Sequence, residues 1–139
     1  MMPFPKEIPH SKFTYQRTKE WGQLYWFDFG EVISGQLTFA EPHPALIIGN
    51  PKITLPGTVI IIPLTGIEHK RPGYEFHVEV TKKECPGLDK DSIAKVDQIY
   101  CVENKLMPDQ YFIGPLPRTV MKRIYPKLLK VLAFDKVMG

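Results

Sequence analysis

Two places in the sequence carry side chains that could move a proton during a reaction. His43 lies between Pro42 and Pro44, and its imidazole gains or loses a proton near neutral pH. Lys95 and Asp97 are separated by one residue, so in a strand both would point to the same side of a sheet. An ammonium group beside a carboxylate favours the ionised carboxylate, which is the form that accepts a proton. Acid–base chemistry beside a fixed positive charge is therefore one function that these residues could perform.

A third place could bind phosphate groups. His69, Lys70 and Arg71 form a short cationic run in a charged loop. Each of the three places also has an ordinary structural interpretation. His43 would then be a loop residue without a chemical role, Lys95 and Asp97 would form a surface ion pair of little energetic value, and the cationic run would be a solvated loop tip.

The composition is that of one globular domain. The chain has 139 residues, of which 43% are hydrophobic and 24% charged, and its formal net charge is +3. No apolar run approaches the length of a membrane span, and prolines interrupt the N-terminus where the core of a signal peptide would lie. Cys85 and Cys101 form neither a metal-binding framework nor a disulfide scaffold, which predicts a reduced, cytoplasmic protein without a metal or other cofactor.

The elements that must position these residues are short strands. The 14 prolines are spread along the chain and separate short apolar segments, a pattern that favours a small sheet protein over a helical bundle. We expect strands at 23–29, 44–49, 58–64, 74–80, 92–102 and 111–114, and a final amphipathic helix to about 134 that Pro126 kinks or divides. In the fourth strand, strict alternation predicts Tyr74 facing inward and His77 facing solvent, and Tyr25, Trp26 and Phe29 are expected in the core unless they stack on bases.

These elements predict a mainly β fold. With no helices to cross between the strands, five to seven of them should pair antiparallel in a small bent barrel that the C-terminal helix covers on one side. Residues 1–20 are interpreted as an N-terminal arm, and residues 21–139 as the domain itself.

The order of the segments resembles that of the MazF/PemK-type toxins of toxin–antitoxin systems. The resemblance covers most of the chain, and no single motif carries it alone. It rests on segments in the family's order: Trp21–Phe29, Pro44–Ile48, Thr58–Thr65, Lys90–Ser92 with Val96–Ile99, and Ile113–Gly114 before the last helix.

The resemblance implies a fold, an activity and partners. Members of the family have a small SH3-like or CcdB-like barrel and act as homodimers. They are sequence-selective endoribonucleases that cleave single-stranded RNA by attack of its 2′-hydroxyl, without a metal, in a groove that a cognate antitoxin blocks. Fold alone does not settle function, because the related CcdB proteins poison DNA gyrase.

The family's site residues map onto this sequence with gaps. Thr65 keeps the position of the family's third-strand Thr or Ser, whereas His43 replaces the Arg that precedes the second-strand proline. The first loop keeps Gln36, in the run Ser34-Gly35-Gln36, but lacks the Glu that usually precedes it. The resemblance therefore implies a catalytic group of His43, Thr65, Lys95 and Asp97, and RNA-binding residues Ser34, Gln36, His69, Lys70 and Arg71.

Three functions stay open at this point. The retained Thr65, Gln36 and Asp97, together with His43, favour an active endoribonuclease. The lost Arg and Glu favour a catalytically silent module that binds an antitoxin or a nucleic acid. A gyrase-directed poison is the third, and only the segment that extends past the last helix speaks for it.

Overall fold

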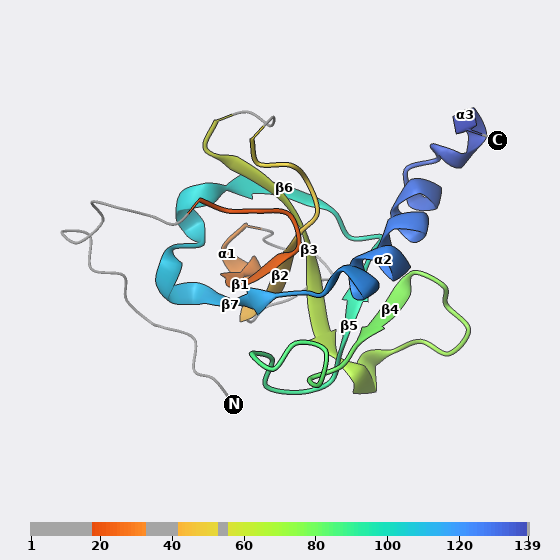
Figure 1. Cartoon of the computed structure of the whole chain (residues 1–139), viewed down its shortest axis with the longest axis horizontal. Helices are drawn as coiled ribbons and strands as arrows, with labels where there is room; N and C mark the ends of the chain where they lie inside the picture. The colour runs from red at the N-terminus through yellow and green to blue at the C-terminus, as the bar shows by residue number, and fades with distance from the viewer. Residues whose placement is uncertain (1–17, 33–41, 53–55, 139) are drawn as a thin grey trace.

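The computed structural model describes residues 18–32, 42–52 and 56–138. Within these ranges the chain forms a seven-stranded antiparallel sheet that curls into a half-barrel, with the helix α2 (Arg118–Val131) after it (Figure 1). The mainly β fold and the C-terminal helix that the sequence predicts are confirmed. The expected N-terminal arm lies almost wholly outside the described residues.

The long strand β3 (Thr58–Gly66) organises the sheet. One of its edges pairs with β2 (Pro42–Ile47), which pairs in turn with β1 (Gln23–Asp28), and β1 with β7 (Phe112–Pro115). Its other edge changes partner along its length. The first half pairs with β6 (Tyr100–Glu103), and the second half pairs with β5 (Ser92–Lys95), which carries the edge strand β4 (His77–Val80).

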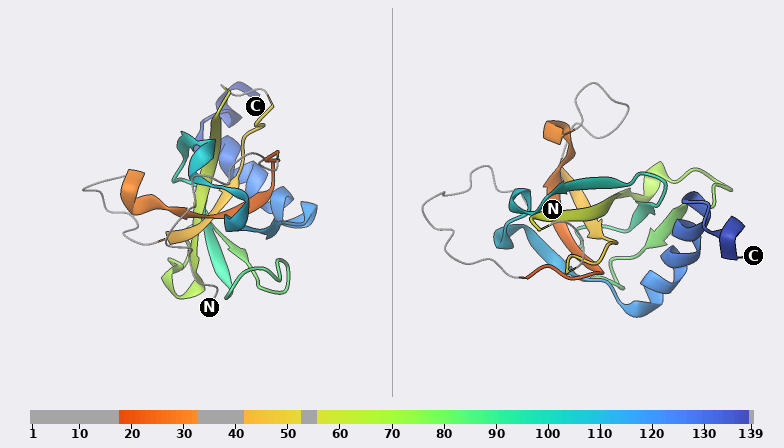
Figure 2. Two further views of the ribbon diagram at one scale, coloured as in Figure 1. Left: turned by 90° about the vertical axis from the view of Figure 1, so that its left-hand side faces the viewer. Right: turned by 90° about the horizontal axis from the view of Figure 1, so that it is seen from above.

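Short helical segments complete the chain between the strands. The one-turn helix α1 (Phe29–Val32) follows β1, and the 3-10 turn η2 (Ile67–His69) follows β3. Two further 3-10 turns, η3 (Asn104–Leu106) and η4 (Asp109–Tyr111), separate β6 from β7, and α3 (Asp135–Met138) ends the described chain. Figure 2 shows α1 and α2 at opposite ends of the sheet.

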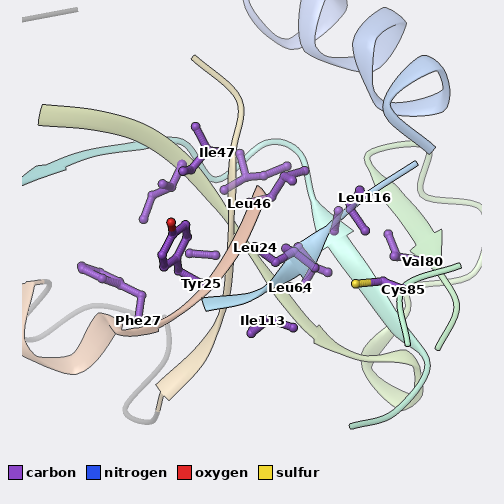
Figure 3. Close-up of a cluster of buried hydrophobic side chains, with 14 of the residues drawn as sticks. Leu24, Tyr25, Phe27, Leu46, Ile47, Leu64, Val80, Cys85, Ile113 and Leu116 are labelled. Carbon is purple, nitrogen blue, oxygen red and sulfur yellow. The ribbon is translucent and has the colours of Figure 1, made fainter. Parts of the chain in front are cut away.

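Both faces of the curled sheet are buried where β1, β2 and β3 pair. Leu24 pairs with Leu46, and Leu46 with Ile62, so these three share one face, while Tyr25 and Ala45 share the other. All five side chains are fully buried. The close-up in Figure 3 shows one continuous cluster that runs from Phe27 and Tyr25 to Val80, Cys85 and Leu116. Trp26 and Phe29 belong to the same core, which confirms the structural interpretation of the first-strand aromatics.

Helix α2 rests on the β4 side of this core. Val120, Met121 and Ile124 are buried beneath it. The helix continues through Pro126, and so the expected division into two helices is wrong. Proline removes one backbone hydrogen bond from a helix, but both Pro126 and the residue four positions earlier, Lys122, are exposed, so water can satisfy the freed carbonyl.

Two of the predicted strands are shorter than expected. The strand predicted at 74–80 begins at His77, because Tyr74 and Arg71 form a turn in which the Tyr74 N–H donates to the Arg71 carbonyl at 3.1 Å. The region predicted at 92–102 is two strands, β5 and β6, joined by a turn in which the Gln98 N–H donates to the Lys95 carbonyl at 3.1 Å. Asp97 lies in this turn, and so strand alternation does not place it beside Lys95.

Candidate functional site

The end of the β4–β5 hairpin gathers polar residues that are far apart in the sequence. His77 on β4 lies directly opposite Lys95 on β5, so both side chains point to the same face. The backbone N–H of Arg71 donates to Nδ1 of His77 at 3.1 Å, and the ring of Tyr74 meets the imidazole edge to face with centroids 4.7 Å apart. The hydroxyl of Tyr74 donates to Asp97. We call these five residues the hairpin cluster.

The hairpin cluster carries a net positive charge and is partly exposed to solvent. Tyr74, His77 and Lys95 are half-buried, whereas Arg71 and Asp97 are exposed. The guanidinium of Arg71 lies 5.6 Å from the centroid of the Tyr74 ring, which is within the range of a cation–π interaction. A phosphate group at this surface would meet positive charge from two chain segments, β5 and the loop before β4, next to one carboxylate.

The environment keeps His77 neutral. Burial lowers the pKa of its imidazole below the ordinary value, and the positive charges of Lys95, Arg71 and Lys70 lower it further, against a smaller opposing effect of Asp97. Tyr74 shifts in the other direction. Its pKa is raised because the hydroxyl donates its proton to the Asp97 carboxylate, and burial and the negative charge of Asp97 add to the effect. Both residues are therefore uncharged near neutral pH.

The cationic run beside the cluster is already engaged in ion pairs. Nζ of Lys70 lies 2.5 Å from a carboxylate oxygen of Glu79 on β4. The imidazole of His69 lies 3.6 Å from Glu68, which also receives Lys90 at 3.4 Å. The Lys70–Glu79 pair holds the loop after β3 against β4, which keeps Arg71 next to the hairpin.

Thr65 lies on the same face of the sheet as His77 and Lys95. It pairs with Ile93, and Ile93 pairs with Glu79, two residues from His77. Opposite residues of an antiparallel pair share a face, as do residues two apart in a strand. Thr65 is only 5% exposed, so it is almost wholly covered by neighbouring residues.

His43 lies at the N-terminal end of β2, on the same face of the sheet as Thr65. It pairs with Phe27 of β1, and its ring centroid is 6.5 Å from that of Phe29. The last pair of the β2–β3 ladder is Ala45 with Pro63. His43 lies two residues beyond this pair along β2, toward the N-terminus, and Thr65 lies two residues beyond it along β3, toward the C-terminus. His43 and Thr65 thus extend from the same end of the same strand pair. Because residues two apart in a strand share a face, both side chains lie on the face that carries the hairpin cluster.

The structure therefore brings together only part of the predicted site. Lys95, Asp97 and Arg71 meet in the hairpin cluster, with Lys70 and His69 in the loop beside it, and His43 and Thr65 share their face of the sheet. Ser34 and Gln36 lie outside the described residues.

Two members of the hairpin cluster were missed. His77 was predicted to face solvent, and it does lie on the same side of β4 as the exposed Glu79, but it is half-buried and its Nδ1 accepts from the Arg71 N–H. Tyr74 was predicted to face inward from a strand, whereas it precedes β4 and donates to Asp97. The signal that could have identified them is the Arg71-Pro72-Gly73 sequence, because Pro-Gly marks a turn that folds the chain back on the strand after it.

In residues 18–32, 42–52 and 56–138, no group of three or more His, Cys, Asp and Glu side chains could hold a metal ion. No helix of the described chain is long and apolar enough to cross a membrane.

Comparison with known proteins decides the family. A profile of the family described as "PemK-like, MazF-like toxin of type II toxin-antitoxin system" matches residues 20–132, most of the chain. The chain is a member of the PemK/MazF toxin family. This confirms the resemblance seen in the order of its segments. No curated protein sequence matches it significantly.

Solved structures show the same PemK/MazF fold at low sequence identity. An endoribonuclease in complex with its cognate antitoxin, from a mycobacterial species, superposes with a TM-score of 0.62 at 19% identity, over 84% of this chain and 96% of that one. MazF from Deinococcus radiodurans gives 0.62 at 18% identity, over 86% and 98%. The MazE–MazF complex of the same organism gives 0.59 at 19%, over 85% and 96%. At these identities the likeness establishes the fold alone.

Proposed function

We propose that this PemK/MazF-family protein is a toxin-like, metal-independent and sequence-selective endoribonuclease that cleaves single-stranded RNA. The observation that carries the proposal is the meeting of Lys95, Asp97 and Arg71 at the hairpin, on the sheet face that also holds His43 and Thr65. A carboxylate among fixed cations suits the cleavage of a phosphodiester, since that reaction needs a proton acceptor and stabilisation of negative charge.

The proposed reaction uses the 2′-hydroxyl of the RNA as its nucleophile. A base, Asp97, takes the proton of that hydroxyl while the 2′-oxygen forms a bond to phosphorus. Lys95 offsets the negative charge that develops on the phosphorane. The bond from phosphorus to the 5′-oxygen then breaks, and an acid returns a proton to that oxygen. The products are a 2′,3′-cyclic phosphate and a 5′-hydroxyl.

His43 is the acid in this proposal. An imidazole exchanges protons near neutral pH, whereas the Arg that usually stands at this position in the family does not. Thr65, with its hydroxyl on the same face, would donate a hydrogen bond to a phosphate oxygen.

The RNA-binding residues extend from the hairpin cluster. Lys70, Arg71 and His69 would contact phosphates on one side of the scissile bond, and Ser34 and Gln36 would contact the RNA from the first loop. Within the hairpin cluster, the aromatic ring of Tyr74 is a surface on which an RNA base could stack.

A homodimer and an antitoxin are the proposed partners, in the cytoplasm. Two of the similar structures are complexes, one of an endoribonuclease with its cognate antitoxin and one of MazE with MazF. For this chain we expect a dimer in solution, and inhibition of RNA cleavage by its own antitoxin. A monomer at micromolar concentration would contradict the dimer.

The experiment is cleavage of a random-sequence RNA pool in the presence of EDTA. The wild type should produce a cyclic phosphate at one side of each cut and a 5′-hydroxyl at the other, at a short common sequence. Asp97→Asn and His43→Ala should each lower the rate about 100-fold, the usual value of one acid or base. Glu103→Gln is the matched control, since that exposed carboxylate lies on β6, away from the hairpin cluster, and forms an ion pair with Lys105 at 3.3 Å.

The outcomes separate the open functions. No cleavage of the pool by a folded wild type would favour a silent binding module. Full activity in Asp97→Asn would remove that residue from the mechanism.

A further inference from the structure

His77 occupies the centre of the hairpin cluster, and the proposed reaction has not used it. Lys95 lies opposite it across the β4–β5 pair, Tyr74 packs against its ring, and the Arg71 N–H binds its Nδ1. Asp97 approaches from the turn after β5 through the Tyr74 hydroxyl. Lys70, from the loop after β3, completes the set of charged groups around the imidazole.

The hydrogen bond from Arg71 fixes the form of the ring. A backbone N–H can only donate, so Nδ1 of His77 must be the unprotonated nitrogen. A neutral imidazole carries one proton, which therefore sits on Nε2. A protonated ring would point an N–H from Nδ1 at the N–H of Arg71 and break this hydrogen bond.

The Nε2–H group of His77 is available to donate a hydrogen bond to a ligand. The structure gives Nδ1 a partner and records none for Nε2 among the described residues. The ring is half-buried, in a surface whose nearest charges are mostly positive. A group that binds there must accept a hydrogen bond and tolerate, or require, positive charge around it. A phosphate oxygen meets both conditions.

We propose that His77 donates a hydrogen bond from Nε2–H to a non-bridging phosphate oxygen of the RNA, as an uncharged donor beside the ammonium of Lys95. This inference rests on the proposed endoribonuclease function and adds a catalytic residue to it. The proton stays on Nε2 throughout, so His77 neither takes the 2′-hydroxyl proton nor supplies one to the 5′-oxygen. Those two transfers remain with Asp97 and His43.

An uncharged donor suits this position for two reasons. The non-bridging oxygens share one negative charge in the bound RNA and gain further charge as the phosphorane forms, so a fixed donor stabilises the transition state more than the bound RNA. A neutral imidazole also needs no protonation step, so its donor is present at every pH at which the ring stays uncharged.

Substitution at His77 tests the role of its Nε2–H. A glutamine amide can place an N–H near the position of Nε2, whereas alanine cannot. His77→Ala should lower the single-turnover rate constant about 100-fold, as for loss of one donor to a developing oxyanion, and His77→Gln should stay within about tenfold of the wild type. The dissociation constant of an all-2′-deoxy analogue of the cleaved sequence should change little in either variant. Equal losses in both variants, or a loss that appears only in binding, would overturn the proposal.

An NMR measurement tests the same claim without activity. Two-bond proton–nitrogen correlations distinguish the two neutral tautomers of a histidine. At about pH 7.5 they should show the Nε2–H form for His77, and its Nε2 proton should shift when the deoxy analogue is added. The Nδ1–H form, or no shift at saturation, would contradict the proposal.

The two experiments also separate this inference from the function on which it rests. A wild type that cleaves no RNA would defeat the proposed function. If the wild type cleaves RNA and His77→Ala cleaves it equally fast, the proposed endoribonuclease function stands and only the role of His77 is contradicted.

Discussion

The hydroxyl of Tyr74 donates a hydrogen bond to Asp97, 23 residues further along the chain. This contact ties the loop before β4 to the turn after β5. It holds the carboxylate that we propose as the base at a fixed place relative to Lys95 and His77. Asp97 lies on an exposed turn, and Tyr74 is the side chain that donates a hydrogen bond to it within the described part of the chain.

Tyr74→Phe should therefore lower RNA cleavage with little effect on folding. The ring and its packing against His77 remain, and only the donor to Asp97 is lost. We expect the single-turnover rate to fall about tenfold, the usual scale of a misplaced catalytic group, while the melting temperature changes by a few degrees at most. Tyr125→Phe is the matched control, because that hydroxyl lies on the exposed side of α2. Unchanged cleavage in Tyr74→Phe would show that Asp97 is oriented by something else.

Lys19 should make the free energy of unfolding depend on pH, whether or not RNA is present. Lys19 is 2% exposed, its ammonium has no hydrogen-bond partner among the residues that the structure describes, and it lies 4.8 Å from the centroid of the Tyr25 ring. Burial lowers the pKa of Lys19 to about 8, from the ordinary 10.5, against a smaller opposing effect of Asp109. Between these two values the unfolded chain binds more protons than the folded one, so the free energy of unfolding should rise with pH across this window.

Lys19→Met removes the charged group and keeps the stem. At about pH 7 the variant should be more stable than the wild type by about 1 kcal/mol, because an unsatisfied buried charge is lost along with a modest cation–π contact. The difference should shrink as the pH rises from 8 toward 10.5. Urea unfolding of both proteins at several pH values, with Lys122→Met as the exposed control, measures it. A variant that is less stable at every pH would contradict a strained ammonium.

Arg123 joins α2 to the β4 side of the sheet by three hydrogen bonds. Its two terminal nitrogens lie 2.9 and 3.0 Å from the two carboxylate oxygens of Glu84, and one of them also donates to the Glu79 carbonyl at 2.8 Å. The Arg123 guanidinium holds the pKa of Glu84 below its ordinary value, with help from the backbone N–H of Thr81. The ion pair thus contributes stability above the ordinary pKa of a carboxyl group, and that stability is lost as the pH falls through the lowered value.

Arg123→Lys should behave nearly like Arg123→Met. A lysine ammonium cannot form the paired contact with the Glu84 carboxylate and reach the Glu79 carbonyl at once. Each variant should lose about 1 kcal/mol of unfolding free energy at neutral pH, since the pair is partly exposed to solvent, and less in acid. Full stability in Arg123→Lys, measured by urea unfolding, would show that charge alone suffices there.

The sequence predicted the sheet well because its signals are local. Aromatic and β-branched runs mark β1 and β3, and the spacing of Val120, Ile124 and Leu128 marks the face of α2. It failed where tertiary contacts override a local rule. Pro126 lies within a helix, at an exposed position next to a buried face of Val120, Met121 and Ile124 that packs on the core. β3 exchanges one partner for another, which divides the region after Ser92 into two strands.

The candidate site was harder to predict than the fold. Alternation gives the side of a strand to which a residue points, and it predicted Lys95 and Asp97 side by side, whereas β5 ends at Lys95 and Asp97 lies in the turn that follows. That Thr65 shares a face with Lys95 follows only from the pairing register of three strands. Alternation cannot reveal that the Arg71–Tyr74 turn brings a backbone donor to His77, nor that Tyr74 reaches Asp97 across two strands. These contacts join residues from separate segments, and a local pattern does not encode them.

The most direct test of the account is attack by the 2′-hydroxyl. An RNA oligonucleotide that carries the cleaved sequence should be compared with one in which only the nucleotide before the cut has a 2′-deoxyribose, both in EDTA. The account predicts that the RNA is cleaved to a cyclic phosphate and that the singly substituted oligonucleotide binds equally well and stays intact. Cleavage of the substituted oligonucleotide at the same bond would contradict the mechanism, because water would then have to be the nucleophile.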